Sequence, residues 1–222
     1  MELADIFPPI GLRVEAGPLV LRPITDELLP ALVELSMRGI HDPDAMPFFY
    51  PWTNAPVEDQ PLNYARFHWG VRSNWNRDLW DLEFAVEHEG RLVGCQGFMT
   101  GSYLVTRTGE TGSWLGREFQ GRGIGTEMRQ AICAFVFDHL DAEEITSAAY
   151  TDNPASNAVS RKVGYQPNGV LRKTRRLGEW HPSQQWVLTR ETFVRGPELT
   201  VTGVEAFRRF IGLDQDGPAT DS

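Results

Sequence analysis

Apolar residues follow strand-like and helix-like spacings in turn along the chain. Short runs of strand type are centred on 19–21, 82–87, 91–99, 110–115, 144–150, 165–177 and 183–188. Helical spacing predicts a first helix that Asp26 caps, and further helices over 61–76, 128–140 and 154–163. This order predicts a mixed sheet with helices on both faces.

The two ends of the chain differ from this central pattern. Residues 1–18 contain prolines and glycines without a sustained period, so we expect an arm before the main domain at 19–196. A C-terminal extension at 197–213 carries a further strand-like stretch at 198–202 and a short helix. The polar residues 214–222 offer no packing side chains, and we expect them to be disordered.

Composition narrows the classes of protein to consider. The chain has 222 residues, and its 21 Lys and Arg against 30 Asp and Glu give a net charge of −9. This charge disfavours nucleic acid or an anionic membrane as a partner. The two cysteines show no metal-ligand spacing, so no metal site is predicted. We also expect no leader or membrane anchor, because the first residues carry acids and prolines and no long apolar run follows. We therefore expect a cytoplasmic protein.

The most informative segment is a glycine-rich turn between a strand and a helix. Gly121, Gly123 and Gly125 can adopt positive φ and bring backbone N–H groups together beside a helix N-terminus, with Arg122 adding charge. Such a turn can bind an anion, although glycines alone also fit a simple flexible turn. A P-loop would need a lysine that is absent, and the antiparallel strands before the turn do not suit a dinucleotide fold.

Two motifs together resemble a known family. Gln120-Gly-Arg-Gly-Ile-Gly125 has the form Q/R-x-x-G-x-G/A of the GNAT acyl-CoA transferases, and Asn153-Pro-Ala-Ser156 followed by Gly164-Tyr165 is similar to the RimJ/RimL-like branch. The resemblance covers about residues 19–193. It implies an α/β (α+β) GNAT fold with a mixed, mostly antiparallel sheet of about seven strands. His41-Asp-Pro-Asp-Ala-Met-Pro-Phe48 and Ser113-Trp-Leu-Gly116 resemble a mycobacterial-type subgroup associated with succinyl-CoA and acetyl-CoA.

The resemblance also implies roles for individual residues. Trp114, Leu115 and Gly116 would lie along pantetheine, and Asn153 would meet it from the opposite side. The pyrophosphate would be held by Gln120, Gly121, Arg122, Gly123, Ile124, Gly125 and Thr126. Ser156 would lie near the thioester sulfur. Many family members place a tyrosine acid four residues later, where this chain has Ser160, so Ser156 is the substitute, directly or through water.

Amine acylation sets a further requirement. A lysine side chain, with a pKa of about 10.4, needs a base to become neutral. Glu110 occupies a strand where the family often carries such a carboxylate, although a solvated strand end would look the same. The aromatic loop at 41–56 suits a lid over the substrate, an aromatic plug or a subunit contact. Its candidate substrate-facing residues are His41, Asp42, Met46, Phe48 and Trp52.

The sequence thus predicts an N-acyltransferase that moves an acetyl group from acetyl-CoA to a primary amine by direct attack in a ternary complex. Succinyl-CoA is the alternative donor. A non-catalytic acyl-CoA-binding regulatory protein also stays open, because the tyrosine is missing. The acceptor would be a small molecule or a protein, and we expect a homo-oligomer.

Overall fold

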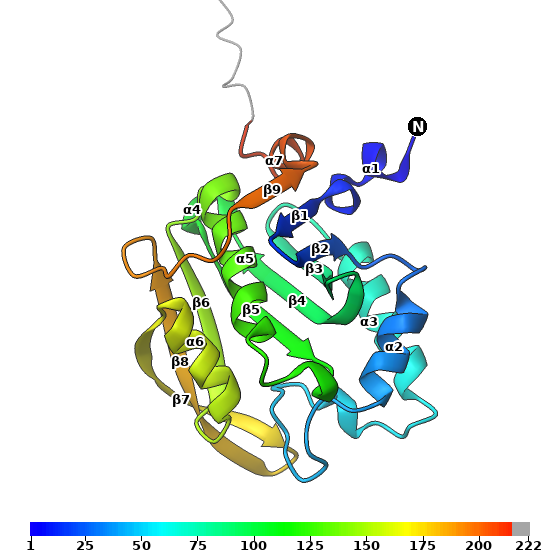
Figure 1. The fold of residues 1–222 in the computed structure, drawn as a ribbon, viewed down its shortest axis with the longest axis vertical. Helices are drawn as coiled ribbons and strands as arrows, with labels where there is room; N and C mark the ends of the chain where they lie inside the picture. Colours follow the sequence, from blue (N-terminus) through cyan, green and yellow to red (C-terminus); the bar gives the residue numbers. More distant parts are fainter. Residues whose placement is uncertain (215–222) are drawn as a thin grey trace, which may run out of the picture.

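The framework of the computed structural model, which describes residues 1–214, is a nine-stranded sheet in the order β7-β8-β6-β5-β4-β3-β2-β1-β9 (Figure 1). Every pairing is antiparallel except that of β5 with β6, which is parallel. The strands are β1 (Arg13–Ala16), β2 (Leu19–Pro23), β3 (Leu79–His88), β4 (Arg91–Gly101), β5 (Thr108–Leu115), β6 (Glu144–Tyr150), β7 (Gln166–Arg176), β8 (Glu179–Thr189) and β9 (Leu199–Thr202).

The sheet is larger than the seven or so strands that the sequence predicts, because both ends of the chain add to it. Strand β1 comes from the expected arm and pairs with β2 and with β9, which comes from the C-terminal extension. Within β1, Val14 and Ala16 are buried. Two apolar residues in a four-residue stretch are too few to reveal a strand, and their burial depends on a segment far away in the sequence.

Helices cover both faces, as predicted. Helix α5 (Ile124–Leu140) lies across one face, and α2 (Leu29–Met37) and α3 (Gln60–Ser73) cover the other (Figure 1). Helix α6 (Pro154–Val163) packs beside α5, and α7 (Val204–Ile211) buries Phe207 in the core. The short elements are α1 (Leu3–Ile6), η1 (Pro8–Gly11), η2 (Trp52–Asn54), α4 (Tyr103–Thr106) and η3 (Arg117–Phe119). Each helix within residues 1–214 is too short or too polar to span a bilayer.

The predicted start of the first helix was wrong. Asp26 does not cap α2, which begins at Leu29 after Leu28 without a side-chain cap. The Asp26 carboxylate instead accepts hydrogen bonds from Trp69 and Arg72 of α3. The Asp26 carboxylate, which the local sequence predicts as a helix cap, is therefore used in a tertiary contact with α3.

The feature that positions the site is the parallel pairing of β5 with β6, which is short. It runs from Thr108↔Glu144 to Glu110↔Thr146 and then stops. Beyond that point β5 stays paired with β4 up to Leu115, and β6 stays paired with β8 up to Tyr150. We call the region between residues 111–116 and 147–150 the fork; its closed end is at Glu110.

The C-terminus of α6 depends on one glycine. Gly164 has φ of 102°, and a Cβ there would lie 1.9 Å from the carbonyl oxygen of Thr192. Gly90, in the turn between β3 and β4, has φ of 75° but no atom within 4 Å of a Cβ. The two positions therefore share backbone strain but differ in crowding.

We expect Gly164→Ala to lower the free energy of unfolding by roughly 3 kcal/mol, because it adds a clash to the left-handed strain. Gly90→Ala should cost only about 1 kcal/mol. Equilibrium urea denaturation measures both, and equal losses would contradict the structural reason given for Gly164.

Candidate active site

The glycine-rich turn leads from η3 into the N-terminus of α5. Gly121 and Gly123 have φ of 75° and 90°, and Gly123 is the residue that precedes the helix. The first backbone bond of the helix runs from Thr126 N–H to the Gly123 carbonyl, at 2.8 Å. Within residues 1–214, the N–H groups of 121–125 donate to no protein acceptor. Free N–H groups at the positive end of a 17-residue helix form an anion site.

Other residues of the motif have different tasks. The Gln120 side chain donates to the carbonyl oxygens of Ile40 and Leu115, at 2.6 and 2.9 Å, so it ties the strand end to the preceding loop. Gly125 lies inside the helix without positive φ, contrary to expectation. A Cβ there would lie 3.5 Å from Leu115 and 3.6 Å from Val159 of α6, which are ordinary contact distances, so packing does not require glycine at this position. Among the remaining positions, Arg122 is exposed, Thr126 is half-buried and Ile124 is buried.

The end of β5 is partly occupied by protein contacts. The Gly116 N–H donates to the Val93 carbonyl at 3.0 Å, and a Cβ at Gly116 would lie 2.6 Å from Leu35 of α2. The requirement for glycine at 116 is thus one of packing. The Leu115 carbonyl is engaged by Gln120, and the Trp114 ring packs against Tyr64 and Trp52, with centroids 6.3 and 6.2 Å away.

Glu110 is the last residue of β5 that pairs with β6, so it stands at the closed end of the fork. Its side chain is half-buried, and burial raises the pKa of the carboxyl above the ordinary value for glutamate. Lys173 and Arg129 partly oppose this rise through their positive charges. The fork therefore has a carboxyl group with an elevated pKa at its closed end.

Asn153 and Ser156 lie at the start of α6. The side-chain oxygen Oδ1 of Asn153 accepts from the Ser156 N–H at 3.1 Å, so Asn153 caps the helix. No protein group within residues 1–214 hydrogen-bonds to the Ser156 hydroxyl. One turn further on, Ser160 is fully buried, and its hydroxyl has no partner among the described residues.

The loop at 41–56 is anchored by polar contacts. Both ring nitrogens of His41 are engaged, Nδ1 with the Asp42 carbonyl and Nε2 with the Thr53 hydroxyl, each at 2.8 Å. The Asp42 carboxylate pairs with Arg117 of η3 at 2.5 Å. Arg117, beside the glycine-rich turn, is therefore already paired with a carboxylate, and His41 serves as an anchor.

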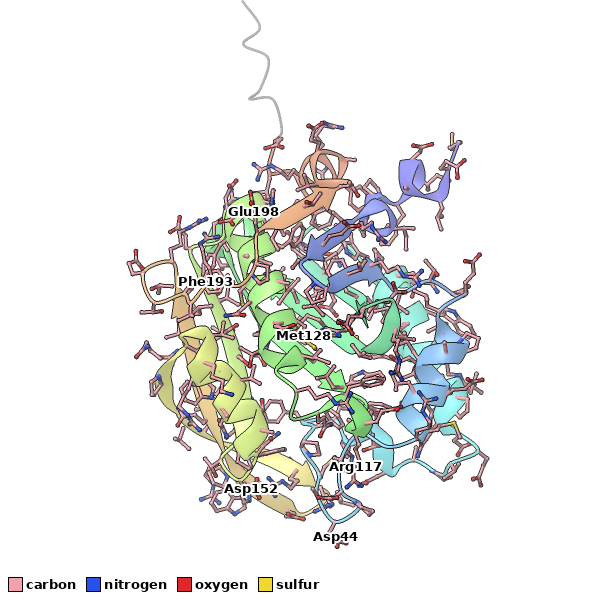
Figure 2. All side chains as sticks on the ribbon, in the orientation of Figure 1. Asp44, Arg117, Met128, Asp152, Phe193 and Glu198 are labelled. Carbon is pink, nitrogen blue, oxygen red and sulfur yellow. The ribbon has the colours of Figure 1, made fainter. Side chains whose placement is uncertain are left out.

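Apolar residues hold the same loop beside both strands of the fork. Met46 is buried, and Phe48 packs between His41 and Trp52, with ring centroids 5.7 and 5.5 Å away. Phe49 contacts Tyr150 at the end of β6, at 4.9 Å. Figure 2 shows Asp44 of the loop near Arg117, at the same end of the molecule as Asp152 beyond β6. The loop therefore reaches from β5 to β6.

Arg129 of α5, which the sequence alone does not single out, also reaches the fork. It is 3% exposed, and it donates to the hydroxyls of Ser147 on β6 and Ser113 on β5, at 2.9 and 3.1 Å. The available signal was its position in the apolar stripe of the helix, one residue after Met128 and three before Ile132. No cluster of side chains able to hold a metal ion occurs within 1–214.

A second buried polar pair lies on the α2–α3 face. The Cys95 thiol donates to the Glu83 carboxylate at 3.0 Å, and Gly97 makes room, since a Cβ there would lie 2.6 Å from the same carboxylate. Burial raises the pKa of Glu83 to about 7, the thiol hydrogen bond opposes the shift, and the charge of Asp81 adds to it. This pair lies on the sheet face that also carries Trp114, because Cys95 is the cross-strand partner of Trp114.

Several solved acetyltransferases share the fold of this chain. Mycobacterium smegmatis RimJ in complex with a CoA disulfide has a TM-score of 0.67 at 19% identity, covering 90% of this chain and 92% of that one. RimL, a ribosomal L7/L12 alpha-N-protein acetyltransferase in complex with coenzyme A, has a TM-score of 0.62 at 18% identity, covering 78% and 95%. At these identities the likeness shows the fold.

Residues 18–166 match the model of the acetyltransferase (GNAT) domain, and the chain belongs to this family. YdaF of Bacillus subtilis (strain 168), named as a candidate ribosomal N-acetyltransferase, is 28% identical over 117 residues. That alignment covers 51% of this chain and 63% of YdaF. YoaA of the same organism, named an uncharacterized N-acetyltransferase, is 26% identical over 160 residues, covering 72% of this chain and 86% of YoaA.

The Glu83 pair makes stability depend on pH. In the unfolded chain a glutamate titrates at about 4.3, so between that pH and the folded value of about 7 the folded state binds more protons, and stability falls as pH rises. We expect Glu83→Gln to remove this fall and to be more stable than the wild type at pH 8 by roughly 2 kcal/mol. Urea denaturation from pH 5 to 8 measures it; Glu144→Gln, at an exposed strand end, is the control. Parallel stability curves for Glu83→Gln and wild type would refute the assignment.

Proposed function

We propose that the protein is an acyl-CoA-dependent N-acetyltransferase that acetylates a primary amine. The observation that carries this proposal is the set of free N–H groups at 121–125, which adjoins the open side of the fork. These N–H groups would bind the pyrophosphate of the coenzyme, with Arg122 at the edge. Pantetheine would then run into the fork toward Glu110, past Trp114 on one side and Asn153 on the other.

The reaction is direct transfer in a ternary complex. The amine nitrogen attacks the thioester carbonyl carbon, the C–N bond forms, the C–S bond breaks, and the electron pair leaves with sulfur. Glu110 takes the proton that the amine loses, for which its raised pKa is suited. The free hydroxyl of Ser156 is the proton donor to sulfur, directly or through water. Orienting the two reactants can itself supply roughly 7–11 kcal/mol.

The acceptor would approach from the side of the loop at 41–56. Phe48, Phe49 and Trp52 line this approach with aromatic surface, and the net charge of −9 attracts a cationic amine. RimL is named for acetylating a protein α-amino group. An α-amino group, with a pKa of about 7.7–8.0, has a larger neutral fraction near neutral pH than a lysine side chain. It would therefore depend less on proton removal by Glu110.

Pyrophosphate binding at 121–125 is tested by calorimetric titration with acetyl-CoA, succinyl-CoA and free coenzyme A. Gly121→Asp should abolish binding of all three, because its carboxylate would oppose the pyrophosphate. Gly90→Asp is a matched control, since both glycines have φ of 75° and open space around a Cβ. Tighter binding of one thioester identifies the acyl group. A native protein that binds none of the three would refute the proposed function.

The base is tested through the pH dependence of kcat with acetyl-CoA and an amine acceptor. Glu110→Gln should lower kcat by roughly 100-fold and remove the rise in rate that follows ionisation of the carboxyl. That rise should lie above the usual range for glutamate, because burial raises the pKa of Glu110. Glu144→Gln should change neither quantity. An unchanged profile in Glu110→Gln would show that another group accepts the proton, and absence of any thiol release would indicate a binding protein.

A further inference from the structure

Arg129 is a buried positive charge at the closed end of the fork. Its guanidinium reaches from α5 to Ser113 on β5 and Ser147 on β6, and so bridges the two strands just beyond their last paired residues. Both partners are neutral hydroxyls. The Ser147 hydroxyl in turn donates to the Thr111 carbonyl oxygen at 3.5 Å. The bridge lies on the α5 face of the sheet, opposite to the side chain of Glu110, because side chains alternate along β5.

The charge of Arg129 has no ionic partner within residues 1–214. No carboxylate lies within 4 Å of it, and its Nε is buried without any hydrogen-bond partner. The nearby hydroxyl and thiol groups continue as a neutral network, in which Tyr165 contacts Thr111 at 2.9 Å and Cys133 at 3.3 Å. The charged groups that act on this region are Glu110 and, from β7, Lys173.

Burying such a charge is unfavourable. An ion removed from water without a partner costs several kcal/mol, and an apolar side chain of similar size would be cheaper in a helix stripe. An uncompensated guanidinium at a closed end therefore suits a ligand that brings negative charge with it. The coenzyme pyrophosphate does not meet this need, because its site is at 121–125, one helical turn or more away along α5.

We propose that Arg129 stabilises the negative charge that develops on the sulfur of coenzyme A as the acyl group leaves. This inference rests on the proposed function, in which pantetheine runs into the fork toward Glu110, and it adds that the thioester sulfur lies beside the bridge that Arg129 makes to Ser113 and Ser147. When the C–S bond breaks, the electron pair stays on sulfur, and the guanidinium beside it remains protonated. The thiolate then takes its proton from the Ser156 hydroxyl or from water, and the amine proton resides on Glu110.

This assignment also accounts for the departure from the family at Ser160. A chain without the tyrosine acid lacks a strong proton donor to sulfur, and a serine hydroxyl is a poor one. A fixed positive charge lowers the need for proton transfer, because it makes the thiolate itself a better leaving group. Charge at a preorganised position acts without reorganisation during the reaction.

The test uses the thiol of bound coenzyme A as the probe. Ultraviolet absorbance of the thiolate, followed against pH, gives the thiol pKa in the complex with wild-type protein, Arg129→Met and Arg129→Lys. We expect the thiol bound to wild type and to Arg129→Lys to ionise at lower pH than the thiol of free coenzyme A. In Arg129→Met the ionisation constant of the bound thiol should be at least tenfold smaller than in wild type. In parallel, kcat with acetyl-CoA should fall roughly 100-fold in Arg129→Met and far less in Arg129→Lys.

Two controls separate charge from structure. The double variant Ser113→Ala with Ser147→Ala removes the bridge but keeps the cation, so it should preserve the thiol ionisation within about threefold. Gln130→Met changes the neighbouring position, whose amide contacts Val194 instead, and should behave as wild type. A double serine variant that reproduces Arg129→Met would show that Arg129 only spaces the strands, and would overturn the proposal.

The remaining outcomes are equally decisive. If wild type binds coenzyme A but its thiol ionises as in solution, the inference about Arg129 fails while the proposed function stands. If Arg129→Met selectively weakens succinyl-CoA and leaves the thiol titration unchanged, the cation serves an acyl carboxylate and the proposal is wrong. If wild type does not bind coenzyme A, the proposed function fails and this inference fails with it.

Discussion

The early end of the β5–β6 ladder is the constraint on which the site depends. Where the two parallel strands part, the backbone groups that face the fork have no partner strand, while each strand keeps its partner on the other side, β4 for β5 and β8 for β6. The sheet therefore opens between β5 and β6 while both strands remain part of it. Helix α5 lies against this opening, so the end of β5, the glycine turn and the helix N-terminus meet in one place (Figure 1).

An acidic protein that binds an acidic coenzyme must concentrate positive potential locally. The net charge of −9 repels anions at long range, and screening confines that repulsion to roughly 8–10 Å. At short range the free N–H groups at 121–125 and the guanidinium of Arg129 dominate instead. Arg117 cannot contribute in the same way, because Asp42 already pairs with it. The positive charges near the fork are thus divided between holding the loop and facing the ligand.

The aromatic loop is integrated into the site. His41, Asp42 and the Ile40 carbonyl tie its first residues to Thr53, to Arg117 and to Gln120. Phe49 extends the contact to Tyr150 on β6. The loop consequently contacts elements on both sides of the fork, and the glycine motif contributes to this arrangement through Gln120 as well as through its backbone.

Several features were readable from the sequence because local chemistry fixes them. The hairpin turn at Glu89-Gly90 uses two residues with positive φ, at 51° and 75°, and α6 begins at its asparagine cap and ends at Gly164. Positive φ at Gly121 and Gly123 followed equally from the lack of a Cβ. Family membership rested on the spacing of two motifs and was confirmed by the match over residues 18–166.

Other features depended on partners that are distant in sequence, and these only the tertiary structure decided. Strand β1 pairs with β9 from the far end of the chain as well as with β2, and Asp26 binds α3 instead of capping α2. Gly125 lies inside α5 without positive φ, while Gln120 and His41 bind loop atoms. Arg129 is the clearest case. From the sequence, Arg129 is an ordinary charged residue on a predicted helix. Its burial between Ser113 and Ser147 follows only from where the paired strands separate.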